Sequence, residues 1–103
     1  MKRGTTAVIP VKILLNHEDI KSVDFIIKEK KESKADTLIS RNYPEDVNFD
    51  GEFYLLELTE EETTSLNAGV VYLDTRIVTN DDKIPNTRIV TVRVDDTLFG
   101  ESM

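Results

Sequence analysis

The sequence predicts an all-β fold, an antiparallel β-sandwich of about seven short strands with one or two single-turn helices. Apolar and polar residues alternate with a period of two through most of the chain, as in strands that bury one face. Turn-forming stretches separate the alternating runs, among them the charged run at 30–34, the Asp50-Gly51 pair and the seven-residue NDDKIPN loop. With 103 residues, of which 39% are hydrophobic, the chain has material for one core. We predict a single domain over residues 1–103, in which 1–5 and 97–103 are flexible or partner-docking tails.

The first alternating run of the chain is predicted to be an edge strand. The run that begins at Ala7 contains Pro10, which has no N–H to donate, so it predicts an edge strand with Pro10 facing outward. Asn16 and Asp19 have a spacing that can cap one helical turn before the next strand. Over all the runs, the residues predicted to face the core are Ile9, Val11, Ile13, Val23, Phe25, Ile27, Tyr54, Leu56, Leu58, Val71, Leu73, Ile77, Val90, Val92 and Val94.

Two turns in the middle of the chain carry specific signals. Asp50-Gly51 stands between apolar runs, which favours a β-hairpin with a type I′ turn, because both central residues of that turn need positive φ. In the stretch LTEEETTSL, Thr59 and Glu62 have the spacing of a capping box. The three glutamates would then lie in the first turn of a short helix, where negative charge complements the helix dipole. Leu66 would pin that helix to the core.

The composition limits the classes of partner. A net charge of -7 repels phosphate backbones, so we expect no nucleic-acid partner. The absence of cysteine removes disulfides and thiolate chemistry, and fits a reducing compartment or a virion built inside one. No apolar run approaches the ~20 residues of a membrane span, and the first residues lack the apolar region of a signal peptide. We therefore expect a chain that is cytoplasmic, or assembled from the cytoplasm, and has no membrane partner.

Acidic residues in two loops are the candidate calcium ligands. Neither loop has the alternating spacing of oxygen ligands that calcium sites use, so solvated turns are the favoured interpretation. Zinc would have only His17 and no thiolate. The same histidine, in a polar turn, does not complete a Ser/His/Asp arrangement. The sequence therefore predicts no catalytic residue, no metal, no cofactor and no enzyme. The loop residues concerned are Glu45, Asp46, Asp50, Glu52, Asn80, Asp81 and Asp82.

Apolar residues on the predicted outer faces are the candidate interaction surface. They are either a patch that pairs with another subunit or residues buried at the rim of their own sandwich. Two more apolar residues follow the last strand, and such a tail can dock on a neighbouring chain or fold back onto its own. The candidate surface consists of Ile26, Leu55, Tyr72, Ile89, Leu98 and Phe99.

An ordered set of short motifs resembles a known family. These motifs are RGTT, IKSV, FDGEF, LTEEET and TVRV, and their order and approximate spacing extend over nearly the whole chain. The set is similar to small proteins from the tail and baseplate gene module of phages and prophages of Gram-positive bacteria, in particular the immunoglobulin-like N-terminal domain of baseplate upper proteins. Ala7 stands where such sequences often have proline, and the region KADTLISRNYP matches poorly.

The resemblance implies an immunoglobulin-like sandwich with an assembly role and no catalytic residues. We accordingly expect a non-enzymatic structural or assembly protein of a phage tail or baseplate, located in the virion and assembled in the bacterial cytoplasm. Its partners would be other tail or baseplate proteins, or further copies of itself. The alternative is a host-facing module that recognises cell-wall carbohydrate or a surface protein, which would need Tyr43, Phe53 and Tyr72 to gather on one face.

Overall fold

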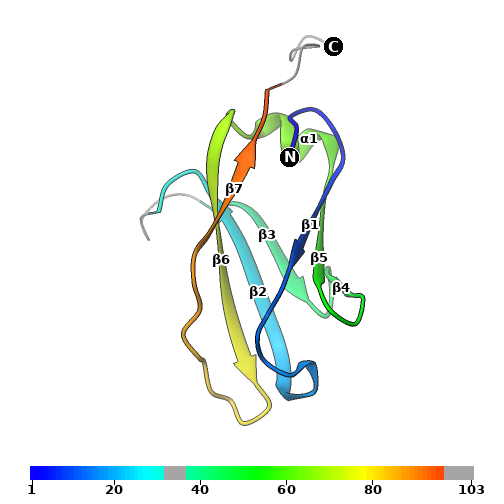
Figure 1. The fold of residues 1–103 in the computed structure, drawn as a ribbon, viewed down its shortest axis with the longest axis vertical. Coiled ribbons are helices and arrows are strands. Elements are labelled where there is room, and N and C mark those ends of the chain that lie inside the picture. Colours follow the sequence, from blue (N-terminus) through cyan, green and yellow to red (C-terminus); the bar gives the residue numbers. More distant parts are fainter. Residues whose placement is uncertain (32–36, 97–103) are drawn as a thin grey trace.

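The computed structural model describes residues 1–31 and 37–96, and its strands form two packed layers (Figure 1). The all-β sandwich predicted from the alternation is confirmed. Seven strands are joined by one turn of 3-10 helix, η1, and one short α-helix, α1. The elements are β1 (Ala7–Val11), η1 (His17–Asp19), β2 (Ile20–Lys28), β3 (Thr37–Tyr43), β4 (Asn48–Phe49), β5 (Tyr54–Leu58), α1 (Glu60–Ser65), β6 (Gly69–Thr79) and β7 (Val90–Val94).

The strand order within the two sheets is that of an immunoglobulin-type sandwich. One sheet has the order β1-β5-β4 and the other has the order β3-β2-β6-β7, and neighbouring strands within each sheet are antiparallel. If β1 is equated with strand B of an immunoglobulin domain, the two sheets become B-E-D and C′-C-F-G. β1 is an edge strand, and exposed Pro10 lies opposite Leu55, as its missing N–H requires.

The helix α1 closes one end of the sandwich, immediately after β5 (Figure 1). The predicted capping box is present: Glu62 N–H donates to the Thr59 hydroxyl at 3.2 Å, and Thr59 N–H donates to the Glu62 carboxylate at 2.9 Å. Leu66 follows the helix and is fully buried, so it pins α1 to the core as expected. At η1 the Asn16 side chain makes no capping hydrogen bond, although the single helical turn forms.

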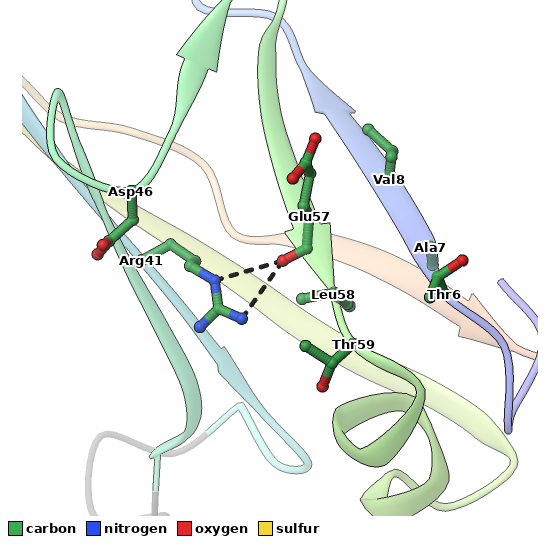
Figure 2. A pocket seen from close by; sticks show the side chains of 8 residues that line it. All are labelled: Thr6, Ala7, Val8, Arg41, Asp46, Glu57, Leu58 and Thr59. Atoms are coloured by element: carbon green, nitrogen blue, oxygen red, sulfur yellow. Dashed lines mark hydrogen bonds between the residues drawn. The ribbon is translucent and has the colours of Figure 1, made fainter.

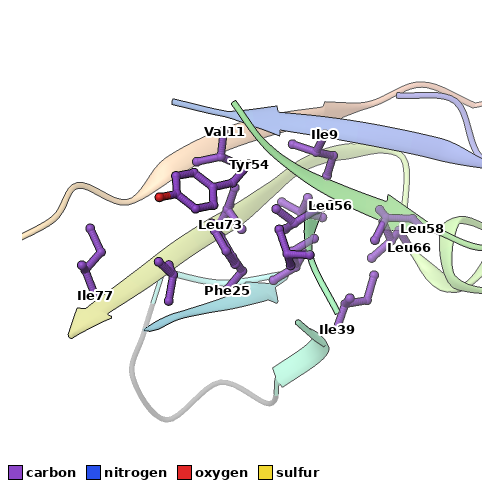
Figure 3. Packing of buried hydrophobic residues seen from close by; sticks show 14 of the residues in the cluster. Ile9, Val11, Phe25, Ile39, Tyr54, Leu56, Leu58, Leu66, Leu73 and Ile77 are labelled. Carbon is purple, nitrogen blue, oxygen red and sulfur yellow. The ribbon is translucent and has the colours of Figure 1, made fainter. Parts of the chain in front are cut away.

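The core fills the space between the sheets with the inward residues of both (Figure 3). Nearly all residues predicted to face the core are buried, and Ile13 and Val92 pack against it from the edge. Val90 is the exception, with 48% of its surface exposed. Val90 has the same parity in the strand as Val92 and Val94, as predicted. It is exposed because β1 ends at Val11 and leaves this end of β7 uncovered by the other sheet.

Two connections differ from their predicted form. The hairpin between β4 and β5 is present, but its loop spans residues 50–53, and only Gly51 in it has positive φ, so the turn is not type I′. The Asp50 carboxylate accepts hydrogen bonds from the backbone of Glu52 and Phe53, and thereby stabilises a longer loop. The connection between β6 and β7 spans residues 80–89, longer than predicted, because the chain after residue 86 does not pair as a strand until Val90.

Residues 1–5, expected as a tail, lie against the sandwich. Lys2 forms a parallel bridge with Asp95, and the backbone of Arg3 donates to the Asp95 carbonyl at 2.9 Å. The Thr5 carbonyl accepts a hydrogen bond from the hydroxyl of Thr63, a buried residue of α1. The N-terminal segment therefore extends the edge of β7 and reaches the helix. The other expected tail, residues 97–103, lies outside the described residues.

Candidate functional site

An open depression of about 590 Å³ lies beside α1, between β1, β3 and β5 (Figure 2). Arg41 reaches across it from β3, and its Nε and Nη2 donate to the Glu57 carbonyl at 3.4 and 3.3 Å. β4 pairs with β5 only at Tyr54 and Leu55, so on that side of β5 no strand of the described residues pairs with Glu57. The guanidinium thus takes the place of a neighbouring strand at this edge, which is a structural task.

Glu62 joins this arginine to the helix cap. Its carboxylate oxygen Oε1 bonds to the Arg41 Nη2 as well as to the Thr59 N–H. Burial raises the pKa of Glu62, but the Thr59 hydrogen bond and the Arg41 guanidinium outweigh it and hold the pKa below the ordinary value. The carboxylate therefore stays charged because two donors share it. The triple-glutamate stretch is a helix cap tied to a sheet edge, and no ligand is needed to explain it.

Arg3 completes the same network at the other end of the helix. Its Nη2 donates to the Thr64 carbonyl at 2.9 Å and its Nε to the Leu66 carbonyl at 2.5 Å. These carbonyls have no partner within a helix that ends at Ser65. A guanidinium there satisfies them and places positive charge at the negative end of the dipole. The arginine of the RGTT motif therefore holds α1 in place.

A cluster of aromatic side chains around His17 closes the opposite end of the sandwich. The Nδ1 of His17 lies 2.7 Å from the Tyr54 hydroxyl, and its Nε2 lies 3.0 Å from the Tyr43 hydroxyl. The imidazole also stacks on Phe49, with ring centroids 3.8 Å apart and planes 3° apart. Burial, and then the neighbouring Tyr43, raise the pKa of Tyr54 to about 12. His17 lies in the polar turn His17–Asp19, as expected, and both of its ring nitrogens are engaged by tyrosines.

Several of the acidic loop residues bond to nearby groups of the fold. Hydrogen bonds from the backbone of Phe53 and Glu52 lower the pKa of Asp50. Asp81 accepts a hydrogen bond from the Thr79 hydroxyl, and Asp82 pairs with Lys21 at 3.0 Å. Within residues 1–31 and 37–96, no three His, Cys, Asp or Glu side chains are grouped so that they could hold a metal ion.

Three of the six predicted surface residues come together on the outer face of the four-stranded sheet. Ile26, Tyr72 and Ile89 line one shallow hollow of about 110 Å³ there, and we call these three residues the outer-face patch. Lysines rim the hollow together with one carboxylate, and these charged residues are Lys28, Lys30, Lys31 and Asp74. Ile26 and Tyr72 are half-buried by their neighbours, whereas Ile89 is exposed.

The other three predicted surface residues do not join this patch. Leu55 is half-buried in the other sheet, opposite Pro10 on one side and Asn48 on the other. Leu98 and Phe99 lie outside the described residues. The six residues predicted together are therefore not one surface in the described part of the chain.

A second apolar surface was missed from the sequence. It is a groove of about 390 Å³ at the open edge of the sandwich, between residues 11–15 and 85–90. Leu14 in one wall is 92% exposed, and Val90 of β7 in the other wall is 48% exposed. The signal available in the sequence was the apolar pair Leu14-Leu15, which continues past the alternating run of β1.

The aromatic residues that a sugar-binding face would need are dispersed. Tyr43 turns inward to His17, and Tyr72 lies on the outer face of the four-stranded sheet. Phe53 is in the hairpin loop that precedes β5. These positions bring no two of the three rings into the ring-to-ring contact of a stacking platform.

Comparison with protein families, curated proteins and solved structures finds no match to this chain. No helix among the described residues has the length and apolar character needed to cross a membrane.

Proposed function

We propose that this domain is a non-enzymatic structural or assembly protein that acts through contacts with other proteins. The outer-face patch carries the proposal. An aromatic side chain and two isoleucines converge there on a sheet face that residues 1–31 and 37–96 leave uncovered. The alternation of the sequence assigns all three to the outer face independently of the structure.

The composition of this patch suits a protein partner. Interfaces with proteins combine an apolar or aromatic centre with a polar rim, and tyrosine is enriched among the residues that dominate binding energy. Here Tyr72 and the isoleucines form the centre, and the lysines with Asp74 form the rim. Positive charge at the rim, on a chain of net charge -7, favours a partner with an acidic surface.

The sequence motifs suggest which proteins these partners are. The resemblance of RGTT, LTEEET and the other motifs to tail and baseplate module proteins implies other tail or baseplate proteins of a phage or prophage. In that setting the domain acts in the virion or in its assembly inside the bacterium.

The test is association with phage particles and with their assembly intermediates. The chain carries an epitope tag in the bacterium that encodes it, the prophage is induced, and the lysate is fractionated on a density gradient. We expect the chain to co-sediment with tail or baseplate proteins, and the change Tyr72→Asp, which introduces a negative charge into the patch, to move it to the free fraction.

Leu38→Asp is the matched control, because Leu38 is also exposed on the four-stranded sheet but does not line the patch. We expect it to co-sediment like the wild type. A wild-type chain found only in the free fraction, encoded away from tail genes, would contradict the proposed role.

A further inference from the structure

The groove at the open edge of the sandwich is the strongest unused feature of the molecule. Ile13, Leu14 and Leu15 contribute one wall, and Pro85 and Val90 contribute the other. The groove is open because the two edge strands stop there: β1 ends at Val11, and β7 begins only at Val90. Among the described residues, the chain beyond these two strand ends forms no strand that would cover the edge of the sandwich. Leu14 is 92% exposed, so its side chain contributes little to the stability of its own fold and would gain from burial against another molecule.

The basic residues that line the groove favour an acidic binding partner. The charged residues in its lining are Lys12 and Arg88, both exposed and both basic, in a chain with 20 acidic and 13 basic residues. An apolar segment with negative charge is therefore complementary to it. The segment TLFGESM, residues 97–103, has this character: Leu98 and Phe99 are followed by Glu101, and the segment contains no basic residue.

The chain's own copy of this segment starts too far from the groove. β7 runs from Val90, at the groove, to Val94, and Asp95 continues it in the bridge with Lys2. At about 3.3 Å per residue, the five steps from Val90 to Asp95 cover roughly 17 Å, whereas the four steps from Asp95 to Phe99 span at most about 14 Å. A chain of this length therefore cannot bring Phe99 back to Val90, and the turn needed to reverse its direction would shorten the reach further.

We propose that residues 97–103 of one copy bind, through Leu98 and Phe99, in the groove of a second copy. The inference rests on the proposed role in assembly and adds a partner, another copy of this chain. Groove and segment lie at different places on the molecule, so the contact is heterologous: each copy offers one groove and one segment. Such a contact propagates head to tail into a ring or a filament.

The first experiment is sedimentation velocity of the full chain over a series of concentrations. We expect the wild type to form oligomers that grow with concentration. Both Leu14→Asp, which puts a negative charge in the groove, and the double change Leu98→Ser with Phe99→Ser are expected to be monomeric. Leu38→Asp, an exposed leucine on the opposite edge strand, should associate like the wild type. A thermal melt of each variant checks that it is folded.

The decisive experiment mixes the two monomeric variants. Leu14→Asp retains a segment, and the double variant retains a groove, so an equal mixture should give a one-to-one dimer and nothing larger. A mixture that stays monomeric, or a wild type that is monomeric at millimolar concentration, would overturn the inference. Oligomers that are lost in Leu14→Asp but kept in the double variant would also overturn it, because they would indicate contact between two grooves. None of these outcomes affects co-sedimentation through the outer-face patch, which uses other residues and another readout.

Discussion

The helix end of the sandwich and the groove at its open edge differ in whether their side chains have partners within the fold. At the helix end, Arg3 and Arg41 donate to carbonyls of α1 and β5 that lack a partner, and Glu62 is shared by Arg41 and Thr59. At the groove, Leu14 and Val90 remain exposed and make no comparable contact with their own fold.

The difference separates residues that stabilise the domain from residues available to a partner. A buried or paired group contributes to the free energy of unfolding, and its removal exposes unsatisfied partners. An exposed apolar group contributes little to that free energy and gains from burial against another molecule. The acidic run at 60–62 belongs to the stabilising class, whereas the apolar surfaces are the candidates for function.

The largest contrast is expected for the same substitution at the two places. Leu66→Ala removes a fully buried side chain beside α1 and should lower the free energy of unfolding by about 2–5 kcal/mol. Leu14→Ala removes an exposed one and should change it by less than about 0.5 kcal/mol. Urea denaturation of both variants checks this, and equal losses would break the comparison.

A second contrast compares two arginines. Arg41→Ala removes the guanidinium that donates to the Glu57 carbonyl and one of the two donors to Glu62, so we expect a loss of about 1–3 kcal/mol in the free energy of unfolding. Arg93 pairs with Asp95, but its side chain is 83% exposed, and Arg93→Ala should have a much smaller effect. If the two denaturation midpoints fall together, the guanidinium at the β5 edge is not a structural element.

The cap itself is tested with two threonines. Thr59→Ala removes the oxygen that accepts from Glu62 and should cost about 1 kcal/mol of stability while leaving partner binding intact. Thr64 lies inside α1, and its hydroxyl bonds back to the Glu60 carbonyl, so Thr64→Ala should cost less. Guanidinium titrations of the pair measure the difference, and a loss of binding at unchanged stability in Thr59→Ala would contradict the capping role.

The smallest effect is expected in the pH dependence of stability. The pKa of Glu62 is lowered in the folded state, so the unfolded chain binds more protons once the pH falls below about the ordinary value of 4.5. Stability from this group is therefore present above that value and is lost as the pH falls through the lower folded pKa. Melting temperatures between neutral and acid pH should fall less steeply in Glu62→Gln and in Arg41→Ala than in the wild type. If the pH dependence of the melting temperature is the same in both variants as in the wild type, Arg41 does not stabilise the charged form of Glu62.

The fold was predictable because its determinants are local. Alternation identified the buried faces of Phe25, Leu56 and Leu73, Pro10 marked an edge strand, and Thr59 with Glu62 marked the helix start. Each of these signals is complete within a few residues. Turn geometry was less accessible, since the side-chain bonds of Asp50 favoured a longer loop over the type I′ turn.

The contacts that close the two ends were not predictable in the same way. His17 meets Tyr43 and Tyr54 across separations of 26 and 37 residues, and Arg3 meets Thr64 across 61. No periodic pattern encodes such pairs, because they depend on where the two sheets meet. The outer-face patch was identified residue by residue from the pattern, but the convergence of Ile26, Tyr72 and Ile89 depends on the pairing of β2 with β6.

The most direct test of the whole account measures stability and particle association on the same two variants. Tyr72→Asp should remain folded and lose co-sedimentation with tail or baseplate proteins. Thr59→Ala should melt at a lower temperature and still co-sediment. If Tyr72→Asp co-sediments like the wild type while Thr59→Ala, still folded, does not, the assignment of structure to the helix end and of binding to the apolar face is wrong.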